Sequence, residues 1–247
     1  MIIDLPSSAS STDFPNNTNS SYKIKLPQKL DLKPGEWSVG LLEAHIPNKF
    51  YNVTDGTVTF ESTKKSIVIK RSVASGFYGS AESIVRRIVI DSQSWNIGDK
   101  SGDEIVEIAY DKRGNRATLT VMAVDDYTVH LSEDLCACLG FKHDSKLGAG
   151  IHKAPRLCNV FTGLSYLLVY TNLVEQRMVG DSQSPLLRVI PVHGSYGDAT
   201  HEFKHTHFVD AAGFNSDVVE VNIRTDTGEY APFVDGKVFL TIELRRK

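Results

Sequence analysis

The chain has 247 residues, of which 41% are hydrophobic and 23% charged, and its formal net charge is −3. This length and composition are ample for a globular core, and the nearly balanced charge excludes a global basic field for nucleic acid or anionic membranes. The longest apolar run, residues 164–170, is far shorter than the roughly 20 residues that a membrane helix needs. We therefore expect no specific nucleic-acid partner and no membrane span.

The three cysteines, Cys136, Cys138 and Cys158, do not form a redox or zinc motif, because C-x-C is too closely spaced for either. An odd number of cysteines and the lack of an apolar N-terminal leader argue against secretion. We expect a soluble protein made inside the host cell, with idle thiols. The sequons at Asn16, Asn19 and Asn52 then go unused, because glycosylation requires a secretory route.

The first twenty residues are rich in Ser, Asn, Thr and Pro and contain only isolated apolar residues. Such a segment is expected to form an extended N-terminal arm rather than part of a core. The arm either frays or becomes ordered against a neighbouring subunit. The sequence therefore predicts an arm over residues 1–20 and one domain over residues 21–247.

From Tyr22 onward, short segments alternate apolar and polar residues or are continuously apolar, and turn residues separate them. Pro47 is expected to end the strand that starts at Trp37, and Gly114 with Asn115 to turn a hairpin. The expected strands cover residues 22–26, 37–46, 57–60, 66–70, 104–110, 117–122, 126–131, 164–173, 186–192, 217–223 and 237–244.

Two short helices interrupt this pattern. Residues 79–90 place an apolar stripe after Ser80, a residue suited to cap a helix. Residues 131–141 start at Ser132, carry two acidic residues in the first turn and stop at Gly140. Many short strands without regular strand–helix alternation indicate an antiparallel, all-β protein, and we expect a single jelly-roll β-sandwich.

Four of the eight histidines lie between His193 and His207. His205 and His207 form H-x-H, which on a strand puts both rings on one face, as in the metal sites of the jelly-roll cupins. His201 lies nearby, but the glutamate that would complete such a ligand set is missing. The pair is thus a weak candidate for a metal site, and exposed or loop-packing histidines are the simpler interpretation.

The tripeptide Asp226–Thr227–Gly228 matches the aspartic protease motif, but Arg224 before it and Glu229 after it do not suit that buried site. A polar turn between two strands explains it better. The sequence contains no nucleophile elbow, no P-loop and no dinucleotide fingerprint. We therefore expect no catalytic residues, no cofactor and no enzymatic activity.

Three blocks of sequence, residues 14–53, 169–198 and 219–244, together resemble the minor capsid, or penton, proteins of Polinton (Maverick) elements and of related virophages and adintovirus-like viruses. The first block contains G-x-W-x-V-G-L-x-E followed by a proline, and the middle block is the most specific. The signature and candidate assembly residues that match are Trp37, Gly40, Glu43, Pro47, Tyr170, Gln176, Gly180, Asp181, Arg188, Asp226, Gly228 and Pro232.

This resemblance implies a single jelly roll that assembles as a homopentamer at the five-fold vertices of an icosahedral virion, beside double-jelly-roll major capsid proteins. A host receptor is a further candidate partner, because a vertex protein can carry attachment in its loops. Two alternatives remain open: a jelly-roll module that binds carbohydrate or a receptor, and a cupin-like metal enzyme.

Glu43 interrupts an apolar strand. With a period of two, Val39 and Leu41 share a face with Glu43, whereas Ala44 and Ile46 lie on the other. The apolar side of the strand therefore changes partway along. We expect Glu43 to be hydrogen-bonded near the edge of the sandwich or at a subunit contact, since a buried carboxylate needs a partner.

Overall fold

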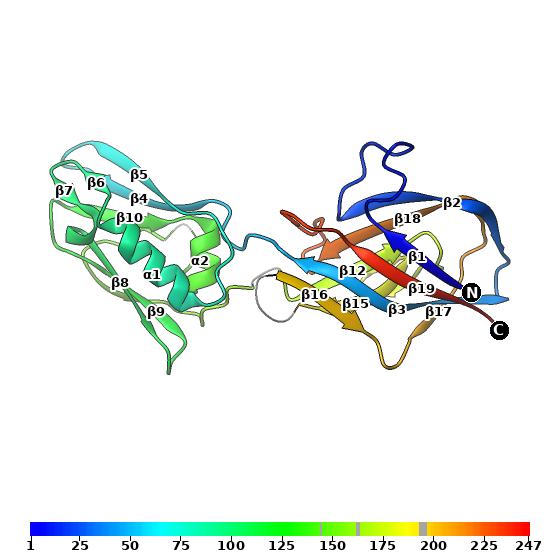
Figure 1. The fold of residues 1–247 in the computed structure, drawn as a ribbon. Helices are drawn as coiled ribbons and strands as arrows, with labels where there is room; N and C mark the ends of the chain where they lie inside the picture. Colours follow the sequence, from blue (N-terminus) through cyan, green and yellow to red (C-terminus); the bar gives the residue numbers. More distant parts are fainter. Residues whose placement is uncertain (144, 162–163, 193–196) are drawn as a thin grey trace. The chain divides into compact units, whose positions relative to one another are not determined.

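The computed structural model describes residues 1–143, 145–161, 164–192 and 197–247, and it divides into two compact units (Figure 1). Met1–Phe50 and Gly163–Lys247 form the jelly-roll unit, and Tyr51–Thr162 form the inserted unit. The all-β expectation is confirmed. The expectation of one continuous domain from residue 21 did not anticipate that the middle of the chain has a core of its own.

The jelly-roll unit is a sandwich of two antiparallel sheets (Figure 1). We call them the β3 sheet and the β12 sheet after a central strand of each. The β3 sheet has the order β1 (Ile2–Pro6), β19 (Phe239–Arg246), β3 (Trp37–Asn48) and β16 (Gly197–Glu202), with β17 (Phe208–Asp210) also paired to β3. The β12 sheet has the order β15 (Leu186–Pro191), β12 (Tyr166–Thr171), β18 (Phe214–Thr225) and β2 (Ser21–Leu32).

The connectivity of these strands is that of a complete jelly roll. Numbered from one to eight in chain order, with β17 continuing β16, the strands give 1-8-3-6 in one sheet and 5-4-7-2 in the other. This double-sheet arrangement of eight strands is the jelly roll of viral capsid proteins, lectins and cupins. Its core lies between the sheets and contains Val39, Leu41, Val169, Val221 and Ile242, each fully buried.

The N-terminal residues differ from the expected loose arm. Residues 2–6 form β1, which pairs antiparallel with β19, and Leu5 is fully buried in the core. The Tyr22 hydroxyl donates a hydrogen bond of 3.2 Å to the Leu5 carbonyl. Further along, the Asn19 side-chain amide donates to the Gly236 carbonyl at 2.8 Å. The polar residues 7–20 that follow concealed this strand. An edge strand also needs few inward side chains, and Leu5 supplies the main one.

A β-bulge explains why the apolar side of β3 changes partway along. Thr241 pairs with Glu43 and the next residue, Ile242, pairs with Leu41, so Leu42 is an extra residue on β3. Such a bulge shifts the side-chain alternation by one position. Val39 and Leu41 before it and Ala44 and Ile46 after it therefore all enter the same core. The strand stays within one sheet throughout.

Other strand boundaries also differ from those expected. β3 continues through Pro47 to Asn48, because β19 pairs with β3 only as far as His45 and Pro47 faces a partner on one side alone. β16 and β17 were not anticipated from the polar, histidine-rich segment that contains them. The turn at Asp226–Gly228 is confirmed, but the strands on either side, β18 and β19, lie in different sheets and form no hairpin.

The inserted unit contains two three-stranded sheets and two short helices. One sheet has the order β10 (Tyr127–Leu131), β4 (Gly56–Ser62), β5 (Ile67–Val73), and the other β11 (Gly150–Lys153), β9 (Arg116–Val121), β8 (Val106–Asp111). The expected hairpin β8–β9 is confirmed, and Asn115 takes the positive φ (46°) in its turn. The expected strands at residues 57–60 and 66–70 also pair as a hairpin, β4–β5. A short hairpin, β6 (Asn96–Ile97) with β7 (Lys100–Ser101), precedes the 3-10 turn η1 (Gly102–Glu104).

Both expected helices are confirmed. In α1 (Ala81–Ser92) the Ser80 hydroxyl accepts a hydrogen bond from the Ser83 backbone amide. In α2 (Glu133–Leu139) the capping residue Ser132 instead accepts from the Thr57 amide at 3.0 Å, and Gly140 ends the helix with φ of 81°. Neither described helix is long and apolar enough to cross a membrane.

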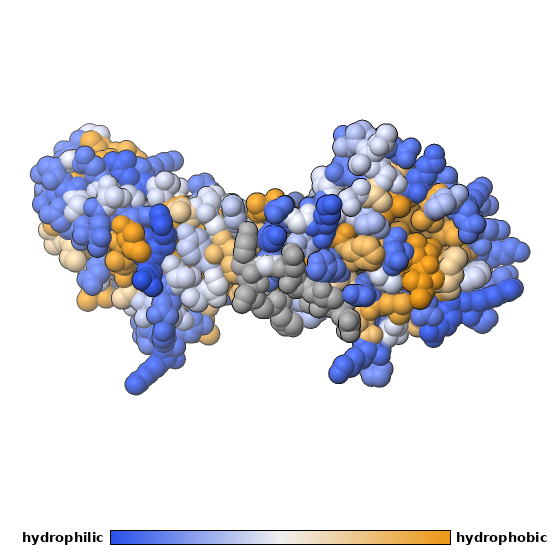
Figure 2. All heavy atoms as spheres, viewed as in Figure 1, coloured by the Kyte–Doolittle hydropathy of each residue, from blue (hydrophilic) through white to orange (hydrophobic). Residues whose placement is uncertain are grey.

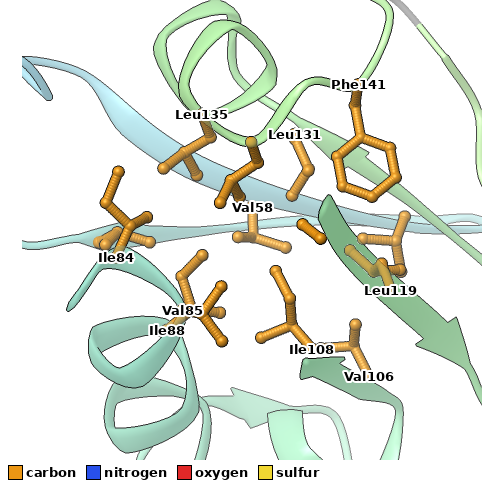
Figure 3. Packing of buried hydrophobic residues seen from close by; sticks show 14 of the residues in the cluster. Val58, Ile84, Val85, Ile88, Val106, Ile108, Leu119, Leu131, Leu135 and Phe141 are labelled. Atoms are coloured by element: carbon orange, nitrogen blue, oxygen red, sulfur yellow. The ribbon is translucent and has the colours of Figure 1, made fainter. Parts of the chain in front are cut away.

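The two helices and both sheets of the inserted unit share one core (Figure 3). Ile84 and Ile88 of α1 and Leu135 of α2 point toward Val58 and Leu119 from the two sheets. Ile84 and Leu135 are fully buried. This core explains why residues 51–162 form a separate compact unit: their apolar side chains satisfy one another.

The three cysteines belong to the same unit, and all three are buried. Burial raises the pKa of the Cys138 thiol to about 12, and burial also raises the pKa of Cys158. The Cys138 thiol lies 3.7 Å from the Asn52 carbonyl oxygen. These thiols fill space in the core, as expected for cysteines that pack as small apolar residues.

Asn52 ties the beginning of the inserted unit to its end. Its amide nitrogen donates to the Tyr78 carbonyl at 2.9 Å and to the Val160 carbonyl at 2.7 Å, and its oxygen accepts from the Tyr78 amide at 2.8 Å. Residues 108 positions apart are thereby held together. The sequon at Asn52 is thus engaged in the fold, since its amide nitrogen already makes two hydrogen bonds.

The bulge predicts that deletion of Leu42 is far more damaging than its truncation. Removing the extra residue would turn either Val39 and Leu41 or Ala44 and Ile46 away from the core. We expect the deletion to lower the free energy of unfolding by roughly 4 kcal/mol or more. Leu42→Ala, which keeps the register and alters a half-buried side chain, should lose about 1 kcal/mol or less. Urea unfolding followed by circular dichroism measures both, and similar midpoints for the two variants would contradict the assignment of the bulge.

The hydrogen bonds of Asn52 predict that Asn52→Ala lowers the free energy of unfolding by about 1–3 kcal/mol, because it leaves polar backbone groups of Tyr78 and Val160 without their partner. Asn16→Ala is the matched control: Asn16 is also in a sequon but is exposed. We expect the control to stay within about 0.5 kcal/mol of the parent protein in urea unfolding. An unchanged stability of Asn52→Ala would contradict the role of Asn52 in holding the beginning and the end of the inserted unit together.

The buried thiols predict slow reaction with Ellman's reagent at pH 8. With a pKa of about 12, Cys138 is almost entirely protonated at that pH, and only the thiolate reacts. We expect less than one equivalent to react rapidly in the native protein and three in urea. Lys112→Cys, at a side chain that is 71% exposed, is the positive control and should add one fast equivalent. Fast labelling of all three native cysteines would contradict their burial.

Candidate functional site

The histidine pair expected as a weak metal candidate lies in the loop between β16 and β17, not on a strand. His205 and His207 are both exposed, and Arg177 brings a guanidinium nitrogen to 3.5 Å from His207 Nε2. Within the described ranges, no group of three His, Cys, Asp or Glu side chains could hold a metal ion. His201 belongs to β16 by its backbone, and His193 lies outside the described residues.

The signature residues on β3 are placed mainly by packing. Gly40 is buried on the outer side of the β3 sheet, under Thr206 and Phe208, and a Cβ atom on it would clash with Thr206 and approach Phe208 to 3.0 Å. Only glycine therefore allows this close cover. Trp37 is partly buried against the core, and Pro47 is buried near the end of the strand.

Glu43 is not at the edge of the sheet, contrary to part of the expectation. Its backbone pairs with Thr241 of β19 on one side and Glu202 of β16 on the other, so it lies in the interior of the β3 sheet. The side chain is half-buried on the outer side, the same side as Thr241. The bulge brings it there, which keeps its charge out of the core. Whether Glu43 meets another subunit stays a prediction.

The middle block of signature residues forms the connection from β12 to β15. It contains the hairpin β13 (Arg177–Val179) with β14 (Ser182–Ser184), whose turn holds Gly180 at φ of 63° beside the exposed Asp181. Gln176 is exposed just before the hairpin. The hairpin pairs with neither sheet.

Arg188 and Tyr170 lie on either side of that connection. The Arg188 guanidinium stacks over the Phe203 ring at 4.3 Å from its centroid. Because β15 and β16 are edge strands of different sheets, this contact joins the two sheets along one flank of the sandwich. Tyr170 lies on β12, half-buried.

The third block forms the tight turn after β18. Gly228 has φ of 87°, and its carbonyl accepts a hydrogen bond of 2.7 Å from Arg224, whose guanidinium also lies 4.4 Å from the Tyr230 ring. The Asp226 carboxylate accepts from the Ser165 amide at 3.2 Å, which ties the turn to the residue that precedes β12. Pro232 is exposed just beyond the turn.

These blocks do not converge on one site. Asp226 contacts Ser165, which precedes β12, whereas Gln176, Gly180 and Asp181 follow the other end of that strand. A catalytic or ligand-binding centre would require the side chains to meet. The signature residues are instead distributed over separate turns and strands of the jelly-roll unit.

Sequence reasoning missed the outer face of the β12 sheet. Leu167 and Val169 of β12 enter the core, while Tyr166, Leu168 and Tyr170 alternate onto the outer face, where Tyr166 is 50% exposed. The signal was present in the unbroken apolar run at residues 164–170. A strand that is apolar on both sides is expected to be covered on both sides.

No protein-family model matches the chain, and no curated protein sequence matches it. Its similarity is instead to solved structures. A chain in the cryo-electron-microscopy structure of the Sputnik virophage aligns with 99% of this chain and 96% of its own, at 9% identity and a TM-score of 0.48.

The crystal structure of the mavirus penton protein aligns with 100% of this chain and 99% of its own length, at 12% identity and a TM-score of 0.50. At this identity the likeness concerns the fold. Since the alignment covers the whole chain, it includes the jelly-roll unit and the inserted unit, and the chain shares its overall fold with the mavirus penton protein.

Proposed function

We propose that this chain is a structural capsid protein, the penton subunit that forms homopentamers at the five-fold vertices of an icosahedral virion. The observation that carries the proposal is the full-length likeness in fold to the mavirus penton protein. The complete eight-stranded jelly roll supports it independently, because this architecture is common in viral capsid proteins.

The described site geometry favours assembly over the cupin-like alternative. The histidines of the cupin-like hypothesis lie exposed in a loop, and the signature residues mark turns, a bulged strand and a flank of the sandwich. Gly40, Gly180 and Gly228 have local backbone roles that any copy of this fold would need. The exposed Gln176, Asp181 and Pro232 are the better candidates for contacts outside the chain.

The partners implied by this proposal are further copies of the chain and a double-jelly-roll major capsid protein, with a host receptor as an additional candidate. The protein would be made inside the host cell and incorporated at the capsid vertices. No catalytic step is assigned to it.

The proposal predicts a ring of five copies. Five chains of 27.3 kDa give a particle of about 137 kDa. Native mass spectrometry or light scattering of the purified full chain at rising concentrations measures this mass. A protein that stays monomeric at high concentration and in capsid-assembly buffers would contradict the proposal, and a trimer would favour the receptor-binding alternative.

A further inference from the structure

The outer face of the β12 sheet carries a continuous apolar and aromatic patch. Strand register places Val189 of β15 beside Leu168 of β12, and Pro191 beside Tyr166. On the other side of Leu168 lies Arg224 of β18, which stacks on Tyr230. Neighbours in register share one face of a sheet, so these side chains form one surface.

This surface is exposed although its composition suits burial. Tyr166, Val189 and Tyr230 are 50%, 40% and 47% exposed, and Leu168 between them is half-buried. Isolated exposed apolar residues are ordinary, but a contiguous patch of them on one sheet marks a contact surface. Arg224 is the cation within it.

The outer face of the β3 sheet, on the opposite side of the same sandwich, carries exposed apolar side chains near both ends of β1. Phe239 is 40% exposed and lies between Pro6 of β1 and His45 of β3, and Ile2 is 62% exposed at the other end of β1. In the space-filling view, orange side chains gather over β1 and β19 among blue ones (Figure 2).

The charges on the two faces are of opposite sign once the ion pairs within each face, Glu243–Arg245 and Lys23–Glu220, are set aside. Three carboxylates lie on the outer β3 face: Asp4 and Glu43 flank Thr241 in register, and Glu243 follows on the same strand as Thr241. Glu243 is paired with Arg245 at 3.1 Å, and Asp4 accepts from the Thr241 hydroxyl at 2.9 Å. The outer β12 face instead offers the guanidinium of Arg224 amid aromatic rings.

We infer that these two faces are the two halves of one contact between copies of this chain: the outer β12 face of one subunit packs against the outer β3 face of the next. The inference rests on the proposed function, since it assigns the surfaces of the ring. A closed ring with cyclic symmetry needs two different, complementary patches on every subunit. The sandwich provides them on opposite sides, with aromatic residues on both and opposite charge.

The test uses two full-length variants that each block one face. Tyr166→Asp with Val189→Asp blocks the β12 face, and Phe239→Asp with Ile2→Asp blocks the β3 face. All four positions are at least 40% exposed, so the fold should survive. Val68→Asp with Ile151→Asp, at positions 63% and 77% exposed on the inserted unit, is the matched control.

By native mass measurement, we expect each blocked variant to be monomeric where the parent protein and the control form rings. An equimolar mixture of the two blocked variants should give 1:1 dimers that do not grow, because each variant supplies the intact face that the other lacks. Circular dichroism and urea midpoints confirm that the variants are folded. Should a double variant be unfolded, Tyr166→Ser and Phe239→Ser replace it, each raising the dissociation constant at least tenfold.

The outcomes separate the inference from the proposed function. A monomeric parent protein refutes the five-fold ring itself. Rings that persist in both blocked variants leave the proposed function intact and overturn the assignment of faces. So does a blocked variant that dimerises with itself, which would indicate a two-fold contact. If the blocked variants still form rings but these rings fail to join capsids, the two faces would contact another capsid protein. That result would also overturn the inference.

Discussion

Strand β3 must present apolar side chains to one core along twelve residues while it pairs on both of its edges. A regular strand with this sequence would fail, because its apolar positions fall out of phase between Leu41 and Ala44. The extra residue Leu42 restores the phase. The rest of the jelly roll depends on this adjustment, since β19 on one side and β16 and β17 on the other take their register from β3.

The bulge also accounts for the position of Glu43. A charged residue in the interior strand of a sheet would be costly if it faced the core. The bulge places it on the outer face beside Thr241 instead, where it adds to the negative charge on that side of the sandwich. One local irregularity thus serves both the packing of the core and the character of a candidate assembly surface.

Much of the fold was predictable from sequence where a strand is amphipathic or a helix is capped. The alternation at residues 22–26 and 238–244 and the caps at Ser80 and Gly140 identify their elements directly. Short strands such as β1, β16 and β17 have too few inward residues to give a pattern. The division into two units was hidden because both are rich in strands, and alternation does not tell which sheet a strand joins.

For the candidate site, the sequence resemblance singled out residues that the structure places in turns and packing positions, but the sequence alone does not give the contacts that hold them there. Gly40 is required by the close cover of Thr206 and Phe208, and Gly228 by a left-handed turn. The exposed Tyr166 and Val189 escaped notice because an apolar residue in a strand is normally assumed to face the core. Only the register between β12 and β15 shows that they share the opposite face.

The hydrogen bond from Asn52 to Val160 has a consequence for how the jelly roll can form. Strands β3 and β12 follow one another in the jelly roll but are separated by more than a hundred residues of chain, and a loop of that length carries an entropic cost of closure and slows long-range pairing. Residues 52 and 160 are held together inside the inserted unit. Once this unit is folded, the flexible chain between β3 and β12 is reduced to a few residues on each side of it. An inserted unit that folds before the jelly roll thus brings β3 and β12 close together, and it shortens the loop that each pairing between a strand before it and a strand after it must close.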